Sequence, residues 1–392
     1  MIRQSPPRCP GIDSKLAMAH PSRPRVLYIL SSRGWGGMEM HPLVVARELR
    51  RRGHGFCAAL AGGSPASVRA RSRGIPHVTL PFRWYLDPVT WAGLKRAVAA
   101  IGADLVHVHW TRDAWHGLLL AGLLKRHYPL VLTRHMASPA ARRRRDPLHR
   151  TLAARLDAVV AISHYVGRNC LETWPCLPPK KVKILYYGVG PEAVGDPQKG
   201  SRIRETYGLS SEDVLVGLVG QISPDKRQDL FLEAAKRVLR QRPETRFLIA
   251  GASTDPVYAE AVRQSCRDPL LRGWVILTGF REDVPDLMQA LDIAVVPSKA
   301  ESLGLVAIEA MANGRPVVGS CSGALPEILE HGANGLLFTA GDTESFAEAI
   351  LTLVADRAKR REMGLAARRT WEERFTLDRE IQETEALYVS LL

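Results

Sequence analysis

The chain has 392 residues, of which 46% are hydrophobic and 24% are charged, and its formal net charge is +14. A chain this long exceeds what one core usually fills, so two globular domains are expected, and no window reaches the roughly 18 consecutive apolar residues of a membrane span. Six cysteines without a CxxC pair, and an N-terminus without an apolar signal region, lead us to expect a reduced, cytoplasmic protein without structural zinc.

Short apolar runs alternate with helical patterns along the chain. In the first half, strands are predicted at 25–32, 54–62, 75–82, 104–110, 128–135, 156–163 and 181–190, with helices at 38–53 and 91–103. In the second half, strands are predicted at 214–223, 246–253, 274–280, 293–298, 315–320 and 334–342, with helices that include 229–241, 284–292 and 303–314. This alternation predicts an α/β protein with parallel sheets covered on both faces.

The Gly/Pro-rich stretch 190–202 predicts the domain boundary. We expect a disordered arm over 1–24, an N-terminal domain over 25–195, a C-terminal domain over 196–375, and a C-terminal helix over 376–392 that could return to the first domain. Ligands of open α/β sheets bind at the carboxyl ends of the strands, so a cleft is expected there.

Charge is unevenly divided between the two halves. Residues 1–195 hold 30 Lys+Arg and 10 Asp+Glu, a net +20, whereas residues 196–392 carry a net −6. The basic half could face an anionic membrane leaflet, an acidic acceptor or nucleic acid, or could serve solubility alone. Nucleic acid is the least favoured, because the basic half has no nucleic-acid motif and no exposed aromatic run beside its arginines.

Two glutamates, Glu301 and Glu309, flank the predicted start of the helix at 303–314. Backbone N–H groups at a helix start, together with the helix dipole, form an anion site. Here those groups belong to Gly304, Leu305 and Val306. A phosphate at this position would leave one acid for hydroxyls on each side, which is the layout of a nucleotide sugar. The alternative is an ordinary strand–helix turn with surface acids.

Further candidates follow other predicted strands. Lys226 lies in a loop ahead of a helix, where a flexible cation suits a diphosphate. A glycine loop ending at Gly37 is not GxGxxG, which disfavours a dinucleotide site. His107 and His109 point the same way on one strand; without further ligands they do not predict a metal site, and a hydrogen bond to a sugar hydroxyl or to a scissile oxygen is favoured. His135 stands similarly at a strand end.

The segment ESLGLVAIEAMANGRPVVGS resembles the E-x7-E signature of retaining GT-B glycosyltransferases, in particular glycosyltransferase family four. GWGGME, DLVHVHW, DAVVAISHYV, KVKILYYGV, GQISPDKRQDLFLEAA and CSGALPEILEHGANGLLF resemble family segments in the same order, so the resemblance covers roughly residues 25–375. It implies a GT-B fold, with two Rossmann-like domains facing each other across a cleft. It also implies a retaining, metal-independent transfer of a hexose from a UDP- or GDP-linked sugar, with no other cofactor.

The resemblance also implies residue roles. Glu309 would hold the ribose, Lys226 the diphosphate together with the amides at the helix start, and Glu301 the transferred hexose. His109 would lie at the reacting face and Gly37 against the phosphate or acceptor. Gln221 stands where the family commonly has an arginine, so a phosphate contact there would carry no charge.

The expected acceptor is a glycan or lipid-linked glycan in cell-envelope polysaccharide or lipopolysaccharide synthesis. The basic half, including Arg142–Arg145, would dock at the inner face of the cytoplasmic membrane. The alternatives are an inactive relative and a GT-B enzyme of another reaction type, such as an epimerase or a phosphorylase. UDP-glucose, UDP-N-acetylglucosamine and GDP-mannose all fit as donors.

Overall fold

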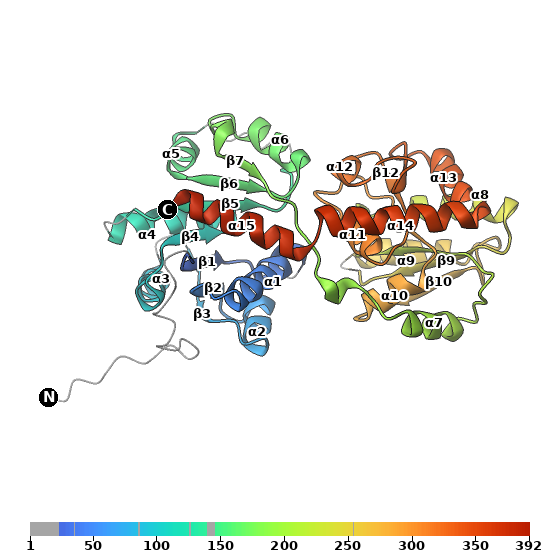
Figure 1. The fold of residues 1–392 in the computed structure, drawn as a ribbon, viewed down its shortest axis with the longest axis horizontal. Helices are drawn as coiled ribbons and strands as arrows, with labels where there is room; N and C mark the ends of the chain where they lie inside the picture. The colour runs from blue at the N-terminus through green and yellow to red at the C-terminus, as the bar shows by residue number, and fades with distance from the viewer. Residues whose placement is uncertain (1–22, 35, 85–86, 125–126, 139–145, 254) are drawn as a thin grey trace. The chain divides into compact units, whose positions relative to one another are not determined.

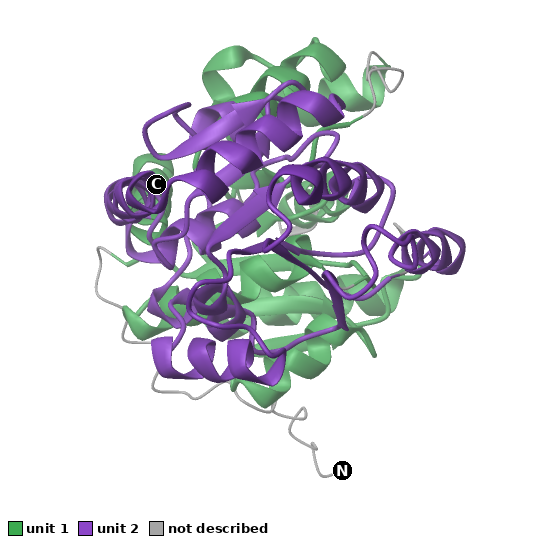
Figure 2. Cartoon of the chain, turned by 90° about the vertical axis from the view of Figure 1, so that its right-hand side faces the viewer, with its two compact units in different colours: residues 1–185, 380–392 green, residues 186–379 purple. Residues whose placement is uncertain are grey.

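The computed structural model describes residues 23–34, 36–84, 87–124, 127–138, 146–253 and 255–392. The chain divides into two compact units, unit 1 with residues 1–185 and 380–392, and unit 2 with residues 186–379 (Figure 2). The predicted arm over 1–24 and the arginine run 142–145 fall almost wholly or wholly outside the described residues. No helix among the described residues is long and apolar enough to span a bilayer.

Unit 1 contains a seven-stranded parallel sheet in the order β3-β2-β1-β4-β5-β6-β7 (Figure 1). Its strands are β1 Val26–Leu30, β2 Phe56–Ala61, β3 His77–Leu80, β4 Leu105–Val108, β5 Leu130–Arg134, β6 Ala158–Ala161 and β7 Val182–Ile184. Its helices are α1 Gly37–Arg51, α2 Pro65–Ser72, α3 Pro88–Ile101, α4 Thr111–Leu124, α5 Pro147–Arg155, α6 His164–Thr173 and the 3₁₀ turn η2 Pro179–Lys181. The central strands read as continuous apolar runs because helices cover both faces of such a sheet.

Unit 2 contains a six-stranded parallel sheet in the order β10-β9-β8-β11-β12-β13. Its strands are β8 Leu215–Val219, β9 Arg246–Ala250, β10 Val275–Gly279, β11 Ile293–Val296, β12 Val317–Ser320 and β13 Gly335–Phe338. Its helices are η3 Pro191–Ala193, α7 Pro197–Thr206, α8 Gln228–Gln241, α9 Pro256–Ser265, α10 Val284–Ala290, α11 Leu305–Ala312, α12 Leu325–Ile328, α13 Thr343–Ala355 and α14 Arg357–Arg374. The predicted α/β class with two Rossmann-like parallel sheets is confirmed.

Each sheet reverses its strand order beside its first strand. In unit 1 the chain builds outward from β1 through β2 to β3 and then returns to place β4 on the other side of β1; in unit 2 the corresponding neighbours are β8 and β11. Loops that leave the carboxyl ends of two such strands diverge to opposite faces of the sheet and leave a crevice, which is where ligands bind. The candidate residues should therefore gather at β1/β4 and at β8/β11.

The strand predicted over 181–190 extends too far. β7 ends at Ile184, and Val189 instead exchanges backbone hydrogen bonds with Phe375 and Leu377. Gly188 packs so closely there that a Cβ atom would lie 2.2 Å from the carbonyl oxygen of Thr376. The units accordingly divide between residues 185 and 186, whereas the boundary predicted from the Gly/Pro-rich stretch lies after residue 195.

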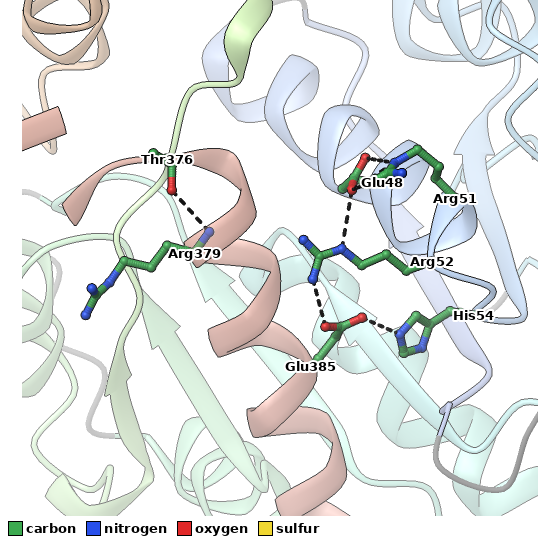
Figure 3. A network of polar contacts seen from close by, with 7 residues as sticks. All are labelled: Glu48, Arg51, Arg52, His54, Thr376, Arg379 and Glu385. Atoms are coloured by element: carbon green, nitrogen blue, oxygen red, sulfur yellow. Dashed lines mark hydrogen bonds and ion pairs between the residues drawn. The ribbon is translucent and has the colours of Figure 1, made fainter. Parts of the chain in front are cut away.

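The C-terminal helix α15, Leu377–Leu391, belongs from Glu380 onward to unit 1. Glu385 accepts hydrogen bonds from Arg52 at 3.0 Å and from the imidazole of His54 at 2.8 Å, and Figure 3 shows Arg52 between Glu385 and Glu48. One turn earlier, Glu380 pairs with the buried His41 at 2.8 Å. Polar contacts of buried groups therefore fix this helix on unit 1 in a single register.

Candidate functional site

The loop after β8 is held in shape by a buried amide. Gln228, at the start of α8, is fully buried; its Nε2 donates to the carbonyl of Gln221 at 3.0 Å and its Oε1 accepts from the N–H of Ser223 at 3.3 Å. Arg227 adopts φ +56°, the left-handed region that a residue other than glycine seldom occupies. This braced turn presents Lys226 at the carboxyl end of the sheet, while Gln221 is exposed.

The loop after β11 brings Glu301 to Lys226. The Lys226 Nζ donates to Oε1 of Glu301 at 2.5 Å, and the hydroxyl of the buried Ser298 donates to the same oxygen at 2.6 Å. A backbone hydrogen bond from Lys299 to Asp225, 2.9 Å long, joins the two loops. Oε2 of Glu301 has no hydrogen-bond partner among the described residues, so one carboxylate oxygen stays available for a ligand.

Helix α11 begins immediately after this loop. Gly304 adopts φ +98° at its N-cap, a conformation that favours glycine, and the N–H groups of Gly304, Leu305 and Val306 make no hydrogen bond to any residue that the structure describes. Leu305 and Val306 are half-buried, so the end of the helix is not sealed by its neighbours. Free donors and the positive end of the helix dipole make this a site for an anion.

Glu309 lies one turn further along α11. Burial raises the pKa of its carboxyl group to about 7, and no described residue hydrogen-bonds that carboxyl group. A desolvated acid without a partner is costly, and hydroxyl donors of a ligand would relieve that cost. The arrangement suits a diol such as that of a ribose.

A third loop, which follows β12, holds the backbone of Glu301 in place. The N–H of Ala324 donates to the carbonyl of Glu301 at 2.8 Å. Gly323, at φ +61°, lies so near that a Cβ atom would come within 2.4 Å of the same carbonyl oxygen. Gly323, Gln228 and Ser298 were not predicted as site residues; the one sequence signal among them was the small-residue context of Gly323, CSGA, directly after a buried strand.

In unit 1, the glycine loop follows β1. Gly37 is the first residue of α1, whose N-cap is Gly36. The hydroxyl of Ser32 donates to the buried carboxylate of Glu39 at 2.6 Å and accepts from the N–H of Gly34 at 3.1 Å, so the loop is closed on α1. Residue 35, within this loop, lies outside the described residues.

The two strand-end histidines share an orientation but not a role. The rings of His107 and His109 stack at 4.6 Å, as the strand period predicts. Both nitrogens of His107 are engaged, with Tyr388 of α15 at 2.6 Å and with Thr133 at 2.7 Å, which makes His107 a structural residue. His109 Nδ1 lies 3.3 Å from His135 Nε2, while His109 Nε2 is buried and has no partner.

His109 is a neutral group. Burial, reinforced by the neighbouring His107 and His135, holds its pKa well below the usual range. Together with Trp110 and Arg134, His109 lines a cavity of about 310 Å³ within unit 1. A neutral imidazole there can exchange hydrogen bonds with a sugar hydroxyl but cannot neutralise a phosphate. No cluster of metal-ligating side chains occurs in the described part of the chain.

The predicted site residues thus gather in two groups. Lys226, Glu301, Glu309 and the first amides of α11 lie in unit 2 at the crevice between β8 and β11. Gly37 and His109 lie in unit 1: Gly37 begins α1, the helix after β1, and His109 directly follows β4. Both groups occupy the positions where the strand order reverses.

Comparison with known proteins shows the family to which the chain belongs. A family model described as glycosyltransferase family 4 matches residues 35–193, and one described as glycosyl transferases group 1 matches residues 213–356. The alpha-maltose-1-phosphate synthase of Mycolicibacterium smegmatis is 30% identical over 335 residues, covering 77% of this chain and 85% of the synthase. The chain belongs to glycosyltransferase family 4.

A second relative is named as an enzyme of lipopolysaccharide core biosynthesis. The lipopolysaccharide core biosynthesis mannosyltransferase LpcC of Rhizobium leguminosarum bv. viciae is 30% identical, covering 72% of this chain and 79% of LpcC. Among solved structures, a glycosyltransferase of Rickettsia africae superposes with a TM-score of 0.84 at 19% identity, covering 94% and 98% of the two chains. Anabaena HepE in complex with UDP and glucose superposes with a TM-score of 0.79 at 23% identity, covering 94% and 100%. The predicted GT-B class and the predicted glycosyltransferase activity are confirmed.

Proposed function

We propose that this family 4 glycosyltransferase transfers a hexose from a nucleoside-diphosphate sugar, bound by unit 2, to a glycan acceptor held by unit 1. The observation that carries the proposal is the N-terminal end of α11, where three backbone N–H groups between Glu301 and Glu309 have no hydrogen-bond acceptor among the described residues. The HepE structures that contain UDP, or UDP and glucose, support a nucleotide-sugar donor on this fold.

The donor is assigned to the unit 2 residues as follows. The diphosphate lies against the amides of Gly304, Leu305 and Val306 and draws Lys226 away from Glu301. Glu309 accepts hydrogen bonds from the ribose hydroxyls, and the free Oε2 of Glu301 accepts from hydroxyls of the hexose. Gln221, exposed near the same loop, donates to a phosphate oxygen without adding charge.

The reaction breaks the bond between C1 of the hexose and the diphosphate oxygen. Negative charge then develops on the leaving diphosphate, where Lys226 and the α11 dipole stabilise it in a fixed geometry. The acceptor oxygen bonds to C1 from the same face, and its proton passes to the departing phosphate oxygen. The configuration at C1 is retained, and neither glutamate acts as a nucleophile. We expect no metal requirement, because the cation and the helix end already meet the charge.

Turnover of donor without acceptor tests the proposal. Among UDP-glucose, UDP-N-acetylglucosamine and GDP-mannose, at least one should raise Tm by mass action and be hydrolysed slowly by the protein. The free sugar, observed by NMR before mutarotation, should first appear with the configuration of the donor. Appearance of the opposite anomer would refute retention, and no binding of any of the three would refute the donor class.

The proposed acceptor is a lipid-linked glycan of the cell envelope, as the lipopolysaccharide relatives suggest. Helix α5, directly after the arginine run 142–145, exposes Arg150, Arg155 and Leu148, the last with 66% of its surface accessible. Cations beside an exposed apolar side chain suit an anionic bilayer surface, where each contributes about 1 kcal/mol.

Flotation with liposomes tests this membrane contact. The protein should float at low salt with vesicles that contain phosphatidylglycerol and should stay unbound with purely zwitterionic vesicles. The variant Arg150→Gln/Arg155→Gln should float less. Failure of the unaltered protein to bind phosphatidylglycerol vesicles at low salt would eliminate the proposed contact.

A further inference from the structure

A second cavity of unit 1, about 530 Å³ in volume, lies at the point where the strand order reverses. It is lined by two serines and an arginine that follow β1, by residues between β3 and α3, and by residues at the start of α4: Ser31, Ser32, Arg33, Phe82, Arg83, Trp110 and Arg112. None of these residues is acidic. The lining therefore combines three basic side chains with two serines and two aromatic rings.

The three arginines of this cavity make no ion pair with a carboxylate among the described residues. Arg33 and Arg83 are exposed, and the Arg33 side chain donates a hydrogen bond to the carbonyl oxygen of Pro81 at 3.3 Å. Elsewhere in the described chain, arginines such as Arg25, Arg52 and Arg204 are paired with acids at 3.3 Å or less. Three unpaired guanidinium groups around one cavity match an anion, because each presents a planar fork of donors.

Arg112 is fixed by the site itself. Its Nη2 donates to the hydroxyl of Ser31 at 2.7 Å, and the N–H of Ser31 in turn donates to Asp113 at 2.9 Å. Asp113 is fully buried, and burial raises the pKa of its carboxyl group to about 6. The guanidinium group of Arg112 is thus oriented before any ligand arrives, which lowers the entropic cost of binding.

Backbone strain marks the part of the lining between β3 and α3. Phe82 adopts φ +44°, and its N–H donates to the hydroxyl of Thr90 at 3.1 Å. In the described chain only one other residue besides glycine has a positive φ, and that is Arg227, next to Lys226 in unit 2. Such strain costs on the order of 1–3 kcal/mol and concentrates at ligand sites. Here it turns the chain so that Arg83 joins the cavity lining.

Trp110 connects this cavity to the cavity of His109. It lines both, as does Arg112, and 37% of its surface is exposed. An exposed indole between a basic pocket and a neutral imidazole can carry a sugar ring on its face. A ligand on Trp110 would place one end among the arginines and the other near His109.

We propose that this cavity binds a phosphate or carboxylate group on the acceptor sugar, so that the acceptor of this enzyme is anionic near the hydroxyl that it transfers to. The inference rests on the proposed function, because it takes unit 1 as the acceptor side. Arg33, Arg83 and Arg112 hold the anionic group, and Trp110 holds the ring.

Calorimetry with simple sugars tests the proposal. With UDP present at saturation, glucose 6-phosphate or glucuronic acid should bind at least tenfold more tightly than glucose, because a hydrogen bond to a charged group contributes roughly tenfold or more in affinity. A preference for glucose 6-phosphate alone identifies the group as phosphate, and a preference for glucuronic acid alone identifies it as carboxylate. Equal binding of all three, or binding of none, overturns the proposal.

A matched pair of double variants separates the cavity from overall charge. Arg33→Gln/Arg83→Gln should abolish the preference for the anionic sugar. Arg71→Gln/Arg96→Gln, which removes the same charge from exposed positions at a different cavity of unit 1, should keep it. The proposal is wrong if the first variant keeps the preference or if the second loses it equally.

Donor chemistry gives the independent readout. Both double variants should bind UDP as tightly as the unaltered protein, because the donor is assigned to residues of unit 2. If the unaltered protein binds no UDP, the proposed function fails; if UDP binds and only the anion preference is missing, the anion site alone fails.

Discussion

Replacing Lys226 with alanine is expected to lower kcat on the order of 100- to 1,000-fold, the usual cost of removing one preorganised charge from a developing anion. The effect should fall on kcat more than on donor KM, because the leaving diphosphate gains charge only as the C1–O bond breaks. Steady-state kinetics with saturating donor measure both constants. Lys226→Arg should recover part of the loss, since it restores the charge in a different geometry.

The ion pair between Lys226 and Glu301 has to be considered in that experiment, because Lys226→Ala also removes a partner of Glu301. In the ligand-free structure Lys226 and Ser298 share Oε1 of Glu301, so alanine at 226 leaves the carboxylate with the serine alone. Lys199→Ala serves as the control, because Lys199 is an exposed lysine of the same unit, paired with Asp286 at 3.5 Å. Unchanged turnover in Lys226→Ala would show that Lys226 has no part in leaving-group stabilisation.

Glu309→Ala is expected to weaken donor binding on the order of 100-fold, because two hydroxyl groups of the ribose would lose a charged acceptor. The change should appear in donor KM and in the Kd of UDP measured by calorimetry, with a smaller effect on kcat. Glu348→Ala, an exposed acid on α13 of the same unit, is the control. A normal Kd for UDP in Glu309→Ala would remove Glu309 from the donor site.

The raised pKa of Glu309 gives this binding a pH dependence. Hydroxyl donors favour the ionised carboxylate, whereas the free protein holds the proton up to pH of about 7. Donor affinity should therefore be constant above that pH and should fall below it, approaching tenfold per pH unit, because binding must then expel the proton. Glu309→Gln should bind donor weakly and without this slope. A slope of the opposite sign, with affinity rising toward low pH, would contradict the assignment.

Much of the architecture follows from local patterns. Buried parallel strands such as β1 and β8 are short apolar runs, and the amphipathic α8 shows helical spacing, so both sheets could be predicted. Glu301 and Glu309 could be found because their spacing is carried by one loop and one helix, contiguous in sequence. The end of β7 could not be predicted, because the backbone conformation of Gly188 and Val189 is set by contacts with residues 375–377, far away in the sequence.

The features of the site that could not be predicted are those that depend on contacts between residues far apart in the sequence. His107 and His109 look equivalent on one strand, yet only His107 meets Tyr388, 281 residues away, and so only His109 keeps a free nitrogen. In the sequence, Gln228 is an ordinary polar residue at a predicted helix start. Only the structure shows that its amide group hydrogen-bonds the backbone of the loop that carries Lys226. Arg33 and Arg83 come from two separate loops and Arg112 from the start of α4, and only the folded sheet brings the three to one cavity.

The most direct measurement is a crystal structure of the protein soaked with UDP. Density should place the diphosphate oxygens within hydrogen-bond distance of the amides of Gly304, Leu305 and Val306, with the ribose hydroxyls on Glu309 and Lys226 turned from Glu301 toward the phosphates. Density for the nucleotide elsewhere, with the start of α11 empty and the Lys226–Glu301 pair intact, would contradict the account.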